Sequence, residues 1–228
     1  MMKVIMFGPP GAGKGTFSSR LAHILGICRI STGDIFREHI AQNTKLGTKV
    51  KDYVQKGMLV PDNIVINVLK KRLVQSDCAK GYILDGYPRT VPQAEALEEE
   101  KIDVIINLVV PDEILIAKCV ARRICQDCGD IYNVLNLDRT IDNVRYLVPS
   151  MSPKVEGKCD KCGGSLIQRI DDNPEMIKRR LDIYREQSRP VVQYYRGRVQ
   201  FIDINMTGAV ELMVNLIMEK LTTVLKNQ

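Results

Sequence analysis

Short apolar runs alternate with amphipathic stretches along most of the chain. Buried strands are predicted at residues 3–7, 27–30, 82–84, 104–110 and 199–204. Helices are predicted at residues 17–25, 34–72 with breaks at Gly47, Gly57 and Pro61, 112–123, 174–195 and 209–225. Strands that alternate with helices are typical of βαβ units, so the pattern predicts the α/β class, with a parallel sheet flanked by helices.

One segment, residues 124–168, departs from this alternation. It contains four cysteines, clustered glycines and prolines, and little helical period. We therefore interpret it as a module inserted into the α/β core. The chain has 228 residues, which is long enough for one compact core that carries insertions.

A glycine-rich loop joins the first predicted strand to the first predicted helix. Its sequence, residues 8–16, reads GPPGAGKGT and fits the phosphate-loop pattern G-x-x-x-x-G-K, with the hydroxyl of Thr16 one position later than usual. Glycines let backbone N–H groups turn towards phosphate oxygens, the helix N-terminus adds positive potential, and Lys14 reaches the outer phosphates. A glycine-rich turn without a ligand is the alternative, but the flanking strand and helix favour nucleotide binding.

Arginines stand at several predicted loop positions. They are Arg37, Arg89, Arg122, Arg123, Arg169, Arg179 and Arg180. Phosphoryl transfer depends on positioning and charge neutralisation more than on a general base, so arginines that converge near a phosphate loop are typical of a nucleotide kinase. Asp85 ends an apolar strand, where its carboxylate can hold water on Mg²⁺; a strand-end cap is its alternative role.

Four of the seven cysteines form two Cys-x-x-Cys pairs. This spacing lets two tight turns present four thiolates to one Zn²⁺, and the predicted ligands are Cys125, Cys128, Cys159 and Cys162. Four protein ligands leave no open position for water, so we expect the zinc to be structural. A redox pair is the alternative, but the sequence lacks the thioredoxin-like pattern that would accompany it.

The composition limits where in the cell we expect the protein and which partners we expect it to bind. The odd number of cysteines argues against a disulfide framework, no apolar run is long enough to span a bilayer, and the N-terminus lacks a signal-peptide cleavage site. We therefore expect a cytoplasmic protein without a membrane partner. The net charge is only +6, and residues 124–168 lack a set of aromatic side chains for base stacking, so a zinc-ribbon nucleic-acid binder is a weaker alternative and no nucleic-acid partner is expected.

These motifs together resemble the adenylate kinase family, in particular its members with a long, zinc-bearing lid. The matching segments, in the family's order, are residues 8–16, 31–37, 57–62, 85–93, 122–125, 153–163 and 169–180. The resemblance implies a P-loop core at residues 1–30, 74–123 and 169–228, a helical NMP-binding domain at residues 31–73 and a zinc lid at residues 124–168. It also implies Mg²⁺-dependent, reversible transfer of a phosphoryl group from ATP to AMP, giving two ADP, with closure of both mobile domains.

The resemblance further implies roles for individual residues. The donor site for ATP would comprise Gly11, Ala12, Gly13, Lys14, Gly15, Thr16, Arg122, Ile131, Tyr132 and Met206. The acceptor site for AMP would comprise Thr32, Arg37, Met58, Leu59, Val60, Gly86, Tyr87, Pro88, Arg89, Gln93, Arg169 and Arg180. The catalytic residues would be Lys14, Asp85, Arg89, Arg122, Arg169 and Arg180. Gln93 would read the adenine edge of AMP, while Asp171 and Asp172 would tie the closed lid to the core.

The sequence departs from the family pattern at several positions. Lys118 stands where an arginine usually flanks the donor base, Asn133 occupies a common histidine position, and Asp203-Ile204 replaces an Asp-Gly pair. The weaker stacking expected of Lys118 keeps a nucleoside monophosphate kinase of broader base specificity as the alternative function. The lid also has an apolar surplus near residues 135–150, which either packs on itself as a hairpin or joins two copies into a homo-oligomer.

Overall fold

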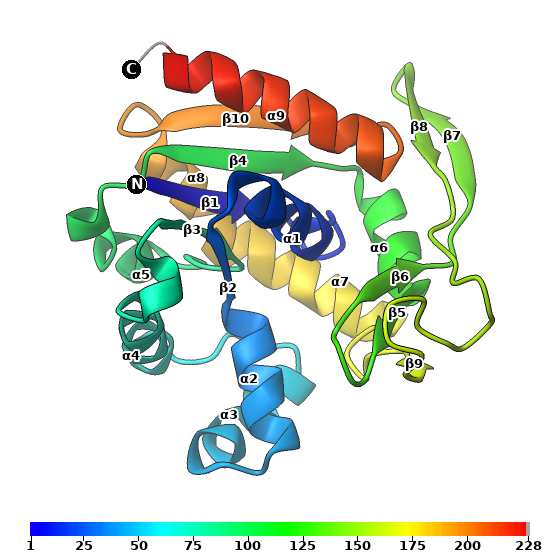
Figure 1. The fold of residues 1–228 in the computed structure, drawn as a ribbon, viewed down its shortest axis with the longest axis horizontal. Coiled ribbons are helices and arrows are strands. Elements are labelled where there is room, and N and C mark those ends of the chain that lie inside the picture. Colours follow the sequence, from blue (N-terminus) through cyan, green and yellow to red (C-terminus); the bar gives the residue numbers. More distant parts are fainter. Residues whose placement is uncertain (227–228) are drawn as a thin grey trace.

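The computed structural model describes residues 1–226, which contain a five-stranded parallel sheet with helices on both faces (Figure 1). The strands follow the order β10-β4-β1-β3-β2. Their bounds are β1 (Met2–Phe7), β2 (Cys28–Ser31), β3 (Gly81–Asp85), β4 (Val104–Val109) and β10 (Gln200–Asn205). Each strand overlaps a predicted apolar run, and all pairings are parallel, so the predicted α/β class is confirmed.

The side chains of β1 alternate between the two faces of the sheet. Val4 and Met6 enter one apolar cluster, together with residues of α1 (Lys14–Leu25), α6 (Asp112–Val120) and α9 (Val210–Lys226). Ile5 and Phe7 enter the other cluster, together with residues of α4 (Asp62–Leu73) and α8 (Arg189–Tyr195). Because both faces are covered, the strand reads as a continuous apolar run instead of an alternating one.

The long helix predicted over residues 174–195 is interrupted. α7 (Pro174–Ile183) continues through a π-helical turn (Tyr184–Ser188) into α8. Pro190, near the start of α8, lacks a backbone N–H, which accounts for the widened turn before it. The short helix α5 (Val91–Glu95) was not predicted, because five residues carry no helical period. None of the described helices combines the length and apolarity needed to cross a membrane.

Residues 31–73 form a helical lobe at one edge of the core (Figure 1). Its helices are α2 (Thr32–Ala41), α3 (Lys45–Gln55) and α4. The predicted break at Gly47 is wrong, because Gly47 lies inside α3, whose first turn is capped by the Thr44 hydroxyl at 3.0 Å from the Gly47 N–H. A Cβ on Gly47 would lie 2.0 Å from the carbonyl oxygen of His39, so this glycine permits the close approach of α2 and α3 and does not end a helix.

Residues 124–168 contain antiparallel strands and, among the described residues, no helix. β5 (Arg122–Cys125) pairs with β6 (Ile131–Asn133) and β9 (Leu166–Ile167), while β7 (Leu137–Ile141) pairs with β8 (Val144–Val148). The helix predicted over residues 112–123 is wrong beyond Val120, because Arg122 and Arg123 pair with β6 instead. The position of these arginines on a lid strand is therefore set by pairing and not by local propensity.

The β7–β8 hairpin lies against the α/β core. Tyr146 is 7% exposed and belongs to the core cluster of α6 and α9, and the hairpin residues that pack beside it are Leu137, Ile141 and Val148. The Leu147 N–H also donates a hydrogen bond of 2.9 Å to the carbonyl oxygen of Thr207. The surplus segment thus forms a hairpin, as in the first alternative, but it buries its apolar side chains on the core as well as on itself.

Candidate active site

The phosphate loop joins β1 to α1, and Lys14 is the first residue of that helix. Gly8, Gly11 and Gly13 have positive φ angles of 140°, 85° and 96°, which glycine adopts without side-chain strain. The Lys14 ammonium donates hydrogen bonds to the carbonyl oxygens of Gly8 at 2.7 Å and Pro9 at 2.8 Å. Burial lowers the pKa of Lys14 to about 7, so an anion bound in the loop would favour its charged form.

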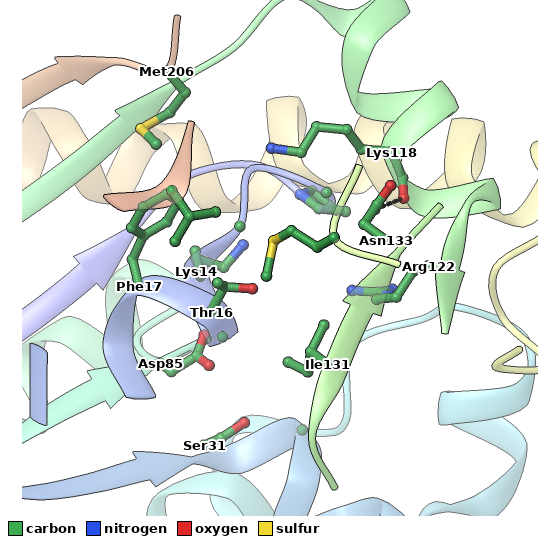
Figure 2. A pocket seen from close by; sticks show the side chains of 18 of the residues that line it. Lys14, Thr16, Phe17, Ser31, Asp85, Lys118, Arg122, Ile131, Asn133 and Met206 are labelled. Atoms are coloured by element: carbon green, nitrogen blue, oxygen red, sulfur yellow. Dashed lines mark hydrogen bonds between the residues drawn. The ribbon is translucent and has the colours of Figure 1, made fainter. Parts of the chain in front are cut away.

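A pocket opens beside this loop, lined by residues of the core, the helical lobe and the lid (Figure 2). It brings together all the predicted catalytic residues and nearly all the predicted donor-site residues: Gly11, Gly13, Lys14, Gly15, Thr16, Asp85, Arg89, Arg122, Ile131, Tyr132, Arg169, Arg180 and Met206. Ala12 is the exception, because its side chain is fully buried in the core cluster. Only the backbone of Ala12 is therefore suited to a phosphate contact.

Six arginines line this pocket: Arg29, Arg37, Arg89, Arg122, Arg169 and Arg180. Burial and the charge of Arg180 lower the pKa of Arg89 to about 10, and burial and the charge of Arg122 lower that of Arg169 to about 9. The Arg169 Nε is buried and finds no hydrogen-bond partner among residues 1–226. Crowded positive charge and an unpaired donor are suited to the oxygens of a phosphoryl group.

Two aspartates that follow the lid orient two of these arginines. The fully buried Asp172 side chain accepts a hydrogen bond of 2.8 Å from Arg122 Nε. Asp171 accepts one of 2.8 Å from Arg180 Nη1. These pairs connect β5 of the lid and α7 of the core through the adjacent carboxylates, so the predicted link between lid and core has a geometric basis.

Asp85, at the carboxyl end of β3, faces the same part of the pocket as Thr16 (Figure 2). Its Oδ2 atom accepts hydrogen bonds from Arg29 Nη2 at 2.5 Å and from the Ser18 hydroxyl at 3.3 Å. Arg29 also pairs with Asp34 at 2.8 Å. The sequence analysis missed Arg29, because its role depends on the register that places β2 beside β3. Carboxylate and hydroxyl oxygens are the donors that Mg²⁺ prefers, so Asp85 and Thr16 fit that ion.

A second pocket lies between the helical lobe and the loop after β3. The predicted acceptor-site residues that line it are Thr32, Arg37, Met58, Leu59, Val60, Gly86, Arg89, Gln93 and Arg180. Tyr87 and Pro88 line a neighbouring pocket with Leu59 and Gly86, whereas Arg169 lines only the first pocket among those described. The acceptor set predicted from the sequence is thus divided between adjoining pockets.

Gln93 in this second pocket is 1% exposed, and both ends of its amide have protein partners. Its Nε2 donates to Asp62 Oδ1 at 2.7 Å, and its Oε1 accepts from the Arg89 N–H at 2.8 Å. Asp62, which the sequence analysis also missed, therefore fixes the orientation of the amide. Its signal was its place at the end of the matching segment 57–62, beside Pro61, where a helix starts.

Lys118 and Asn133, two residues that depart from the family pattern, line the far end of the first pocket. Burial lowers the pKa of the Lys118 ammonium to about 8. The Asn133 amide donates a hydrogen bond of 2.8 Å to the Lys118 backbone carbonyl (Figure 2). The hairpin and the residues that follow it contribute further lining residues that sequence reasoning did not identify, Val148, Pro149 and Met151. Met151 is held there by paired backbone hydrogen bonds with Asn133, at 3.2 and 2.7 Å.

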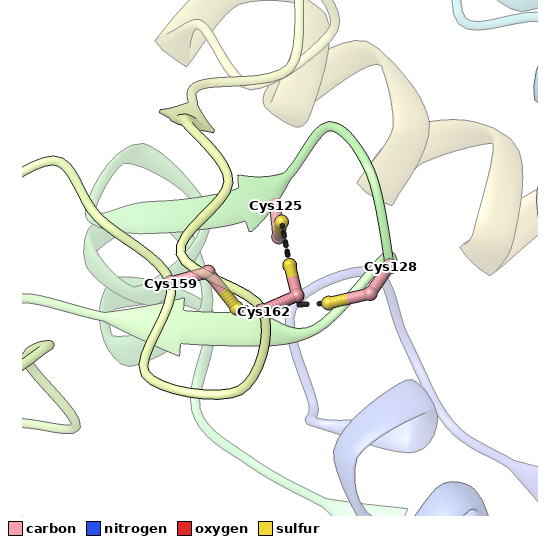
Figure 3. Close-up of side chains that lie close together, drawn as sticks. All are labelled: Cys125, Cys128, Cys159 and Cys162. Carbon is pink, nitrogen blue, oxygen red and sulfur yellow. Dashed lines mark hydrogen bonds between the residues drawn. The ribbon is translucent and has the colours of Figure 1, made fainter.

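The four cysteines of the lid form one cluster (Figure 3). All four sulfur atoms lie within 4.8 Å of one another, with 3.4 Å between Cys125 and Cys162 and 3.6 Å between Cys128 and Cys159. Tetrahedral Zn²⁺ with Zn–S bonds of about 2.3 Å places its ligands roughly 3.8 Å apart, so this donor set fits zinc. The Tyr132 hydroxyl adds an outer contact of 3.5 Å to the Cys159 sulfur.

The phosphate loop, the parallel sheet and the cationic pocket together define a P-loop nucleotide phosphotransferase. The comparisons with known proteins agree. The family model for adenylate kinase matches residues 6–200. An adenylate kinase of Archaeoglobus fulgidus is 44% identical over 216 residues, covering 92% of this chain and 93% of that protein. One from Lachnospira eligens is 47% identical over 204 residues, covering 86% of this chain and 89% of that protein.

The chain therefore belongs to the adenylate kinase family. It is an enzyme that binds ATP, AMP and ADP and catalyses the reversible reaction of ATP with AMP to give two ADP. In this family ATP reacts together with Mg²⁺.

Proposed function

We propose that ATP lies over the phosphate loop and AMP against the helical lobe, so that the phosphoryl group crosses between them beside Lys14 and four of the arginines. The observation that carries this proposal is the convergence of Lys14, Arg89, Arg122, Arg169 and Arg180 on one pocket. Their charges stabilise the phosphoryl group during transfer, and closure of lid and lobe excludes water that would otherwise accept it.

Replacing Lys14 tests these roles. We expect Lys14→Ala to keep the melting profile of the native protein while losing activity by about a hundredfold or more, because its charge acts on the transferred group. A coupled assay of ADP formation and a thermal melt provide the two measurements. Lys220→Ala, an exposed substitution on α9, is the matched control. Near-normal turnover of Lys14→Ala would refute the assignment.

Asp85 and Thr16 are the residues we propose to hold the Mg²⁺ that accompanies ATP. When bound, this ion neutralises phosphate charge. Arg29 and Ser18 orient the Asp85 carboxylate through the hydrogen bonds to its Oδ2 atom. Binding of Mn²⁺ as a spectroscopic substitute, in the presence of a non-hydrolysable ATP analogue, should weaken in Asp85→Asn while ATP affinity without metal changes little.

Base selectivity is set separately in the two pockets. Gln93 is positioned by Asp62 and Arg89 to present its amide to the acceptor base, which we infer to be adenine. Lys118 and Asn133 face the donor base, where an ammonium stacks less well than an arginine and relaxes donor choice. A side-by-side assay of AMP, CMP, UMP and GMP with several nucleoside triphosphates tests both statements. Broad acceptor use would support the alternative kinase of wider base specificity.

The Cys125, Cys128, Cys159 and Cys162 cluster is, in this proposal, a structural zinc site of the lid. The spacing of its sulfurs and the absence of a water position in a four-thiolate set support this role. Metal analysis of the freshly purified enzyme should find one zinc per chain. A purified enzyme without metal, or with iron in its place, would contradict the assignment.

A homo-oligomer through residues 135–150 remains a prediction, as does the cytoplasmic location. The surface available to a second copy is small, because Tyr146 is buried on the core, although Val144 and Leu147 stay 38% and 41% exposed. Measuring the solution mass of the whole enzyme and of a Leu147→Ser variant tests the idea. A monomer in both cases would remove it.

A further inference from the structure

A second pair of cysteines lies far from the zinc cluster in the chain. Cys28 is the first residue of β2, and Cys78 ends the short 3₁₀ helix Ser76–Cys78 that precedes β3. Their sulfur atoms are 2.7 Å apart, although 50 positions separate them in the sequence. A disulfide bond is about 2.05 Å long, so a small closing movement would join them.

Polar contacts hold the Cys78 side of this pair in place. Arg72 Nη1 donates a hydrogen bond of 3.0 Å to the Cys78 sulfur. Arg72 is held there by a bidentate pair with Asp77, at 2.8 and 2.6 Å. Cys78 is 3% exposed, whereas Cys28 is half-buried. Burial and the neighbouring Cys78 raise the pKa of Cys28 to about 12, so Cys28 carries its proton at neutral pH.

The location of the pair gives a crosslink a structural consequence. Cys28 precedes the helical lobe of residues 31–73, and Cys78 follows it, so a bond between them would close the whole lobe into a ring at its junction with the core. Neither cysteine lines the pockets that hold the predicted donor and acceptor residues. The bond would therefore restrain the base of the lobe without removing any group from the site.

We propose that Cys28 and Cys78 form a reversible oxidation site, at which hydrogen peroxide converts the two thiols into a disulfide that staples the base of the acceptor lobe. The Cys78 sulfur attacks one peroxide oxygen, the O–O bond breaks, and the departing hydroxide takes up the proton of the Cys78 thiol to become water. The Cys28 sulfur then displaces the hydroxyl of the Cys78 sulfenic acid, and the Cys28 proton leaves with it as a second water. The two sulfurs lose two electrons in total, and hydrogen peroxide gains them.

The test uses the zinc-loaded, reduced enzyme treated with limiting hydrogen peroxide. We expect peptide mass spectrometry to find Cys28 linked to Cys78, the thermal midpoint to rise by roughly 5 °C, and both changes to reverse with a dithiol. Zinc release is followed with a chromophoric chelator, because the lid thiolates are the competing targets. Activity of the linked enzyme should stay within about twofold of the reduced enzyme, since neither cysteine lines the site.

Cys28→Ser is the decisive variant, because Cys28 is half-buried and the substitution changes little volume. We expect it to keep its activity and reduced melting temperature and to lose the response to peroxide. Cys28 and Cys78 remaining reduced while zinc is released would overturn the proposal, as would a rise in the thermal midpoint that persists in Cys28→Ser. A second zinc per chain that protects both thiols would also overturn it, by showing a metal site instead.

Discussion

The two insertions of this enzyme are stabilised in different ways. The helical lobe of residues 31–73 buries Phe36, Val50, Val65 and Leu69 in a cluster that continues into the sheet through Ile5 and Ile30. The lid of residues 124–168 has a cluster of its own in which Cys125, Tyr132 and Cys159 are the buried members. A segment that shares the main core is held by the hydrophobic effect, whereas one with so little buried apolar surface is stabilised by the zinc that we propose for it.

The β7–β8 hairpin is intermediate between these cases. It belongs to the lid in sequence, yet Tyr146 lies in the main core cluster. One end of the lid thus carries the proposed zinc site, and the other end is anchored by apolar contact with the core.

The largest effect should follow loss of the proposed zinc site. Structural zinc contributes an apparent 10–16 kcal/mol, on the order of the values in small zinc domains, so Cys159→Ser should unfold the lid. We expect kcat to fall by about a hundredfold or more, because Arg122 lies on β5 of the lid, while AMP binding by the lobe changes only a few-fold. Steady-state kinetics and calorimetric titration with AMP provide the measurements.

A chelator added to the Cys159→Ser variant should have no further effect, whereas it should reproduce the loss of activity in the native enzyme. If AMP binding were lost as completely as turnover, the two insertions would be one cooperative unit and the comparison would be wrong.

A smaller effect should follow Leu69→Ala in the lobe. Leu69 is 2% exposed on α4, and truncating a buried leucine costs about 2–5 kcal/mol of the free energy of unfolding. Because the lobe shares the main core, the loss should appear in global unfolding by denaturant, with zinc content unchanged. Leu212→Ala, at a side chain that is 61% exposed, is the control and should change stability by less than about 0.5 kcal/mol.

Tyr146→Ala should release the hairpin from the core. Burial of a large apolar side chain is worth about 1.5–3 kcal/mol, so amide exchange in β7 and β8 should accelerate while exchange in β1 stays slow. Tyr146→Phe, which keeps the ring, is the matched control. Unchanged exchange in the hairpin of Tyr146→Ala would show that Leu137, Ile141 and Val148 hold it without the tyrosine.

The smallest expected effect is the uptake of protons when a nucleotide binds, which should differ between ATP in the donor site and AMP in the acceptor site. The folded enzyme holds Lys14 with a pKa of about 7 and Lys118 with one of about 8, both lowered by burial. At pH 8 Lys14 is mostly neutral, and phosphates nearby raise its pKa, so ATP binding should take up a fraction of a proton. Arg89, with a pKa of about 10, is already charged, so AMP binding should take up less.

Calorimetry in buffers of different ionisation enthalpy measures this uptake. It should vanish below about pH 6, where both lysines are charged before binding. Proton release on ATP binding at pH 8 would contradict the predicted direction. Unchanged proton uptake in Lys14→Ala would show that a group other than Lys14 takes up the proton.

Local sequence patterns were enough to predict the parts of the molecule whose structure depends on residues close together in the chain. The alternation of apolar runs predicted the strands, and the glycines of residues 8–13 together with Lys14 predicted the phosphate loop. The paired Cys-x-x-Cys spacing predicted a cluster whose sulfurs do lie together. The error at Gly47 arose because a glycine needed for close packing of two helices has the same sequence signal as one that ends a helix.

The sequence by itself determined the α/β class, the phosphate loop, the cluster of four lid thiols and, through its motifs, the adenylate kinase family. These depend on the order of residue types within a few turns or one strand, where backbone geometry leaves few choices. Only the tertiary structure decided that Arg29 orients Asp85, that Asp62 fixes Gln93, that the lid hairpin rests on the core, and that Cys28 meets Cys78. Each of these contacts joins residues from separate elements, and only strand register and helix docking bring them together.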